Sequence, residues 1–141
     1  MTELFPRLRA AAIDGRAHNV FYRQVQLEQL CQALISNASN LRDAIATDYS
    51  HSPAEIAVEL NLAISAIRRD YATLEPKAAH QEEYLIEGGE DAPNSRRPAG
   101  IVYIEPCTHT LLYSVVAPLS AAIAAGSCVV VLVRLAHLHE V

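Results

Sequence analysis

The sequence predicts a helix-rich α/β fold, in which amino-terminal helices pack on one strand–helix–strand unit. The first observation is periodicity, because apolar residues recur every three or four positions over residues 19–75, as on one face of a helix. The second is charge. Of 11 Lys and Arg and 16 Asp and Glu residues, only Glu105, Arg134 and Glu140 follow Ala99. The first part therefore resembles a charged helical layer, and the rest a buried unit.

Length and composition indicate one globular domain. The chain has 141 residues, of which 51% are hydrophobic and 19% charged, so it can bury a core and is not disordered. We divide it into a helical layer (1–76), a connecting loop or hairpin (77–98), a strand–helix–strand unit (99–133) and a tail (134–141).

Charge and cysteine usage exclude several classes of protein. The net charge of −5 gives no basic surface for nucleic acid. The three cysteines are scattered without a CxxC pair, which predicts neither a zinc knuckle nor a disulfide framework. A reducing, cytoplasmic location is favoured. The first residues show no long apolar segment typical of a secretory signal.

Three helices are expected in the first half. Residues 19–37 carry one apolar stripe, and a break at 37–40 separates them from a short helix with Leu41, Ala44 and Ile45 on one side. Ser52, Pro53 and Glu55 then form a helix start with a capping box, and Glu75-Pro76 marks the end of this third helix.

Residues 77–98 read as an exposed connection. Tyr84-Leu85-Ile86 is a candidate short strand, Gly88-Gly89 marks a loop, and an acidic run precedes Arg96-Arg97. A solvated segment explains this charge better than a binding function does.

Residues 99–133 predict a partial Rossmann-like βαβ unit. Strands at 100–104 and 128–133 flank a helix at 111–125 that is apolar on every side, and Gly126 fits its carboxyl-terminal cap. The stretch free of charged residues is long enough for a membrane span, but Pro118, Gly126 and three serines divide it, which favours the βαβ unit.

Several motifs resemble the amino-terminal part of the aldehyde dehydrogenase superfamily. Arg23, Gln26, Leu27, Leu30 and Leu34 match its helix pattern, and residues 44–55 (AIATDYSHSPAE) run in step with its next motif. Residues 98–111 (PAGIVYIEPCTHTL) are similar to Pro-x-Gly-Val-x-x-Ile-x-Pro-Trp-Asn-Tyr-Pro-Leu, and residues 118–131 (PLSAAIAAGSCVVV) to Pro-Leu-x-x-Ala-x-Ala-Ala-Gly-Asn-x-Val-Val. The resemblance covers about residues 20–133 and implies a truncated amino-terminal segment.

Departures from the family pattern bear on function. Thr108 stands where the family has the Asn of its oxyanion hole, and Leu132 where a Lys holds the cofactor ribose. The family's catalytic Cys, general-base Glu and glycine-containing cofactor loop follow the region of resemblance. The resemblance therefore assigns no catalytic residue here, and it implies no dehydrogenase activity and no nicotinamide cofactor.

Cysteine and histidine patterns offer further candidates. Cys107 with His109 could form a replacement nucleophile, but a plain loop cysteine is favoured, and Cys31 and Cys128 read as small core residues. His137, His139 and Glu140 have a spacing that metals sometimes use, but no third ligand stands at a characteristic distance, so no metal is expected.

Two classes of function remain open. One is a cofactor-independent enzyme, an isomerase or cyclase that positions an apolar small molecule in a pocket lined by the 106–114 turn. Its site residues would be Thr108 and His109 as hydrogen-bond donors, with Tyr103 and Tyr113 as walls or weak acids. The other class is a pseudoenzyme that binds a protein partner or a full-length relative. The open sheet also predicts a homo-oligomer, because two parallel strands alone leave edges uncovered. Of these two classes of function the enzyme is favoured, because the composition still builds a core that could enclose a cavity.

Overall fold

The computed structural model describes residues 4–48, 51–90 and 98–132. Within these ranges the helices are α1 (Leu4–Asp14), α2 (Val20–Ser36), α3 (Ala38–Asp48), α4 (Pro53–Ala72), α5 (Pro76–Glu87) and α6 (Leu111–Ala124), with a 3-10 helix η1 (Arg16–His18). Two strands, β1 (Ile101–Ile104) and β2 (Cys128–Val131), flank α6 in sequence. The predicted helix-rich α/β class is confirmed.

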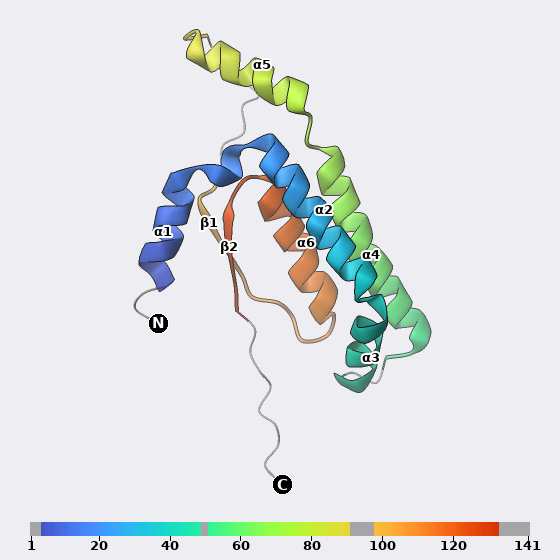
Figure 1. The fold of residues 1–141 in the computed structure, drawn as a ribbon. Helices are drawn as coiled ribbons and strands as arrows, with labels where there is room; N and C mark the ends of the chain where they lie inside the picture. Colours follow the sequence, from blue (N-terminus) through green and yellow to red (C-terminus); the bar gives the residue numbers. More distant parts are fainter. Residues whose placement is uncertain (1–3, 49–50, 91–97, 133–141) are drawn as a thin grey trace.

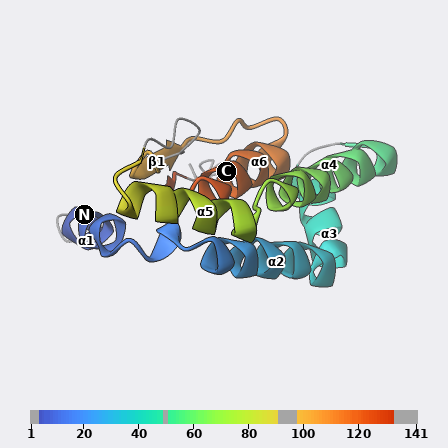
Figure 2. The ribbon, with the colours of Figure 1, turned by 90° about the horizontal axis from the view of Figure 1, so that it is seen from above.

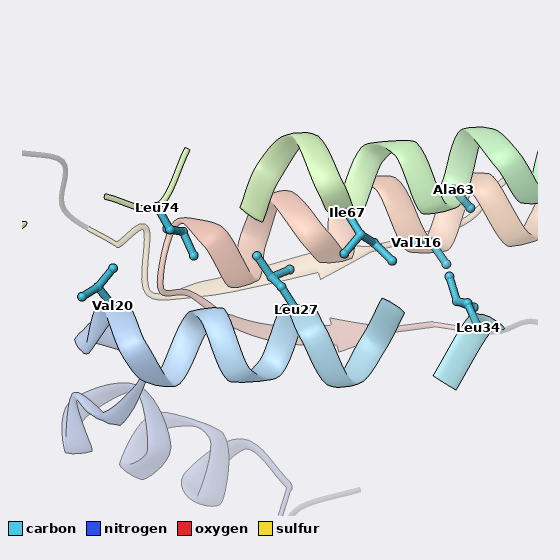
Figure 3. Close-up of a cluster of buried hydrophobic side chains, with 7 residues drawn as sticks. All are labelled: Val20, Leu27, Leu34, Ala63, Ile67, Leu74 and Val116. Carbon is cyan, nitrogen blue, oxygen red and sulfur yellow. The ribbon is translucent and has the colours of Figure 1, made fainter. Parts of the chain in front are cut away.

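The core lies where α2, α4 and α6 pack side by side. Figure 1 shows α2 running antiparallel to α4 and α6, which run in the same direction. The buried side chains of this core, drawn in Figure 3, come from all three helices and from the second residue after α4: Val20, Leu27, Leu34, Ala63, Ile67, Leu74 and Val116. These residues include Val20, Leu27 and Leu34 from the apolar stripe predicted for residues 19–37.

The start of α4 follows from its sequence. The Ser52 hydroxyl accepts a hydrogen bond from the Glu55 backbone N–H at 3.3 Å, and the Glu55 carboxylate accepts one from the Ser52 N–H at 2.7 Å. This reciprocal capping box satisfies two backbone donors that have no partner within the helix. Pro53 at the first helical position needs no such partner, so the predicted boundary is confirmed.

The strand–helix–strand prediction is confirmed. β1 and β2 form a two-stranded parallel sheet in which Ile101 lies opposite Cys128 and Ile104 opposite Val131. The strands are less covered than predicted, since all four residues of β2 are only half-buried and Ile101 and Tyr103 are exposed. Among the described residues, no helix combines the length and the apolar character that a membrane crossing requires.

Residues 76–87 correct one prediction. The expected strand at Tyr84–Ile86 is wrong, because these residues belong to α5. Pro76 opens the helix, and the Lys, Ala, Gln and Glu residues that follow are good helix formers. Figure 1 shows α5 projecting beyond the packed helices. Among the described residues, the two strands pair with each other, so this apolar triplet has no strand neighbour there.

Two further boundaries differ from the prediction. The break between the first two predicted helices is a single residue, Asn37, whose side-chain amide donates to the Ala33 carbonyl at 2.8 Å and caps α2. The helix α1 and the 3-10 helix η1 were not anticipated from the sequence. The tail at 134–141 lies outside the described residues.

Gly126 allows the chain after α6 to approach η1. Its φ angle is +77°, and a Cβ atom at this position would lie 2.7 Å from the Ala17 carbonyl oxygen. Glycine adopts this positive φ angle without strain and has no Cβ atom to clash with the carbonyl, so it is the residue that fits here. The close approach anchors η1 beside the turn that leads into β2.

Candidate functional site

The turn between β1 and α6, residues 105–110, carries most of the predicted site residues. Thr108 and His109 lie on this turn with exposed side chains. Tyr103 lies on β1 and is 57% exposed, and Tyr113 lies half-buried in the first turn of α6. The four residues therefore share one segment around the carboxyl end of β1, but three of them, Tyr103, Thr108 and His109, are exposed.

Cys107 is held in this turn by a small hydrogen-bonded cluster. Its Sγ lies 3.4 Å from the Thr110 hydroxyl, and its backbone N–H donates to the Ser114 Oγ at 3.1 Å. Hydrogen bonds from the side chain and then the backbone of Thr110, followed by Ser114, lower the pKa of Cys107 to about 7. A substantial fraction of this exposed thiol is therefore ionised at neutral pH.

The imidazoles of His51 and His109 lie beside each other. Their ring centroids are 5.3 Å apart, and the Nε2 of His51 lies 3.2 Å from the His109 carbonyl oxygen. The pKa of Glu55 is lowered, first by its hydrogen bond with the Ser52 backbone and to a smaller extent by the nearby charge of both histidines. These contacts connect the turn to the start of α4.

Two buried carboxylates of α4 position α6. Glu59 accepts a hydrogen bond from the Tyr113 backbone N–H at 3.1 Å, and Asp70 accepts one from the Ser120 hydroxyl. Neither role is predicted by the motifs described above, although acidic residues beside an apolar helical stripe are a usable signal. Because Glu59 already occupies the amino terminus of α6, a negative charge developing on a substrate there would be repelled rather than stabilised.

Arg23 holds the opposite end of α6. Its guanidinium donates to the Ala124 carbonyl at 2.7 Å and to the His18 carbonyl at 3.2 Å. A cation at a helix carboxyl terminus complements the helix dipole. Burial lowers the pKa of Arg23, with Glu83 opposing the effect, and its buried Nε atom has no hydrogen-bond partner among the described residues. Arg23, which the family resemblance also covers, therefore acts as a structural clamp.

Two hollows in the surface lie away from the predicted site. A groove of about 380 Å³ runs between α2 and α4, and its lining includes Cys31, Ile35, Arg68 and Tyr71. A second hollow of about 400 Å³ lies against α5. Neither is lined by any of the four predicted site residues. The pocket expected around residues 106–114 is therefore not at either place.

No metal centre is found in the part of the chain that the structure describes, since no three His, Cys, Asp or Glu side chains there gather to hold an ion. The candidate ligands His137, His139 and Glu140 lie outside the described residues.

Comparison with known proteins finds similarity to aldehyde dehydrogenases. Aldehyde dehydrogenase family 3 member B1 from Bos taurus is 32% identical over 136 residues, and the same protein from Mus musculus is 32% identical over 129 residues. Each match covers 88% of this chain. The chain is an aldehyde dehydrogenase-like segment. It spans 27% of the length of these relatives. No family model matches it, and no solved structure does.

One position in this aldehyde dehydrogenase-like segment bears on cofactor binding. Leu132 directly follows β2, and its backbone N–H donates to the Ile104 carbonyl at 2.9 Å. Its side chain is exposed and apolar. The position that the resemblance assigns to a ribose-binding lysine therefore offers no hydrogen-bond donor from its side chain.

Proposed function

We propose that this chain is a non-catalytic aldehyde dehydrogenase-like segment that binds another aldehyde dehydrogenase-like chain through its sheet. The observation that carries the proposal is a parallel sheet of two strands whose residues are mostly half-buried or exposed. The likeness to aldehyde dehydrogenases rests on the identity of 32% with the relatives reported above.

The composition of the strands supports this function. β2 reads Cys-Val-Val-Val and β1 reads Ile-Val-Tyr-Ile, which is typical of strands covered on both faces. In the described residues each strand has one neighbour, so each leaves one edge of backbone N–H and C=O groups available for pairing. An added apolar strand would pair with such an edge and cover side chains such as Ile101 and Tyr103.

The partner follows from the family likeness. About three quarters of each of these relatives lies outside the part that aligns with this chain, since the match covers 27% of their length. A second chain of the same kind carries the apolar parallel strands that fit such an edge. A full-length relative and a second copy of this chain are therefore the two forms of partner we expect.

Binding to an immobilised full-length aldehyde dehydrogenase from the same source organism tests the proposal. We expect saturable binding that Tyr103→Lys weakens by at least roughly tenfold, because a charge would then be buried at the contact. Val58→Lys, at an exposed apolar position on α4, serves as the matched control and should bind like the unmodified chain. Absence of saturable binding, or equal weakening by both variants, would contradict the proposal.

A cofactor-independent isomerase or cyclase is the second candidate function. It is supported by the position of Thr108 and His109 at the carboxyl end of β1, where α/β proteins bind ligands, and by the ionisable Cys107 beside them. Against it stand the exposure of both side chains and the carboxylate of Glu59 at the amino terminus of α6.

Metabolite profiling separates the two functions. If the chain is an enzyme, a strain producing it and its deletion differ in an apolar small molecule, and His109→Ala or Thr108→Ala slows turnover by about ten- to a thousandfold. If the deletion changes the level of no small molecule and the chain still binds its partner, the enzyme function is rejected and the binding function is retained.

A further inference from the structure

The helix α1 exposes an apolar and basic face. Phe5 is 66% exposed and Ile13 is 83% exposed. Arg9 lies four residues from each, so the three side chains follow one stripe along the helix. Large apolar side chains at this exposure contribute little to the fold of a single copy. The stripe is therefore available for contact with another surface.

The helix α5 exposes an apolar and acidic face. Tyr84 is 75% exposed, and Glu87 lies three residues further along, on the same side of the helix. Tyr84 and Leu85 also line the hollow of about 400 Å³ together with Gln81 and Glu90. This hollow is large enough to accept an apolar side chain of the size of Phe or Ile.

The charges of the two elements are complementary. Arg7, Arg9 and Arg16 outnumber Asp14 over α1 and η1, whereas residues 76–90 carry four glutamates against Lys77. Among the described residues, neither Arg9 nor Glu87 takes part in an ion pair. Figures 1 and 2 show that α1 and α5 lie at different places on the surface, each beyond the α2–α4–α6 core.

We propose that α1 of one copy docks on α5 of a second copy, with Phe5 and Ile13 against Tyr84 and Leu85. This contact uses a surface other than the sheet and does not depend on the function proposed above. Apolar burial provides the affinity, and pairing of Arg9 with Glu87 fixes orientation, since exposed ion pairs alone contribute little. In a two-fold dimer the same contact occurs twice, because each copy presents both helices.

Charge reversal with mixing tests the contact. Sedimentation equilibrium of the unmodified chain at tens of micromolar should give a dimer. Arg9→Glu places like charges at both contacts of a dimer, and so does Glu87→Arg, so each variant alone should dissociate at least roughly tenfold more readily. An equimolar mixture of the two variants restores opposite charges at both contacts and should return dimers. Arg42→Glu, at an exposed position on α3, is the matched control and should remain dimeric.

The mixture distinguishes contact between copies from contact within one. If α5 met α1 of the same chain, the double variant would recover but the mixture of single variants would not. Far-ultraviolet circular dichroism establishes that each variant is folded, as expected for exposed positions. A monomeric unmodified chain, single variants that stay dimeric, or a mixture that stays monomeric would each overturn the proposal. A dimer held by the sheet instead would persist in both single variants and would dissociate in Tyr103→Lys, which leaves α1 and α5 unchanged.

Discussion

The carboxylate of Asp70 on α4 accepts a hydrogen bond from the hydroxyl of Ser120 on α6, and both residues are buried. The Asp70 carboxylate also accepts a hydrogen bond from the Arg69 Nε–H at 3.2 Å. With Glu59 bonded to the start of α6, the two helices are joined by polar contacts at two levels along their length. The α4–α6 pair is therefore fixed in register as well as packed.

Ser120→Ala should lower the free energy of unfolding by about 1–3 kcal/mol, because it leaves a buried carboxylate oxygen without its donor. Urea denaturation measures the change. Ser65→Ala, at an exposed position on α4, is the control and should stay within about 0.5 kcal/mol of the unmodified chain. Equal effects of the two substitutions would show that the contact with Asp70 adds no stability.

Gly126→Ala should destabilise the protein more than Gly89→Ala does. Both glycines have positive φ angles, +77° and +74°, so both substitutions carry the cost of about 1–2 kcal/mol for a left-handed alanine. At Gly126 the new Cβ would also meet the Ala17 carbonyl at 2.7 Å, whereas nothing lies within 4 Å at Gly89. Thermal unfolding of both variants isolates the effect of the contact with η1. Equal melting temperatures would contradict it.

Cys107 should react with a thiol reagent such as iodoacetamide with a rate that rises with pH around a midpoint near 7, since only the thiolate attacks. Thr110→Val removes the leading hydrogen bond to the sulfur and should move the midpoint upward, toward the ordinary thiol value of 9.0. Thr108→Val, beside Cys107 on the same turn, should leave the midpoint in place. Mass spectrometry of the labelled peptide distinguishes Cys107 from Cys31 and Cys128. An unmodified chain with a midpoint near 9 would contradict the prediction.

Titration calorimetry with NAD and NADP should show no saturable binding. The reason is the apolar Leu132 after β2, where the family resemblance implies a lysine that holds the cofactor ribose. Saturable binding at micromolar cofactor would mean that another side chain takes over this role.

The sequence was informative where local chemistry decides structure. Ser52, Pro53 and Glu55 determine the start of α4 by themselves, and the apolar runs at 101–104 and 128–131 indicate paired strands. The helix α5 was missed because Tyr84-Leu85-Ile86 has strand propensity, while the long helix-forming run before it outweighs those three residues.

The site was harder to predict because it depends on contacts between distant segments. The bond between Glu59 and Tyr113 joins residues 54 positions apart, so an acidic residue beside the apolar stripe of α4 does not by itself reveal its partner. Nor does the sequence tell how far Thr108 and His109 protrude. That follows from the way the turn leaves β1 and is held by Ser114 and His51. Their catalytic role stays a prediction.

The clamp formed by Arg23 has a consequence for the order of folding. Its guanidinium bonds the Ala124 carbonyl, 101 residues further along the chain, and Ala17 meets Gly126 across a similar separation. During synthesis, α2 and η1 emerge from the ribosome long before these partners exist. Closing so long a loop lowers the entropy of the chain before the stabilising contacts can form. Folding should therefore be slower than in helical bundles built from local contacts. The amino-terminal helices therefore reach their final positions only after α6 has been made.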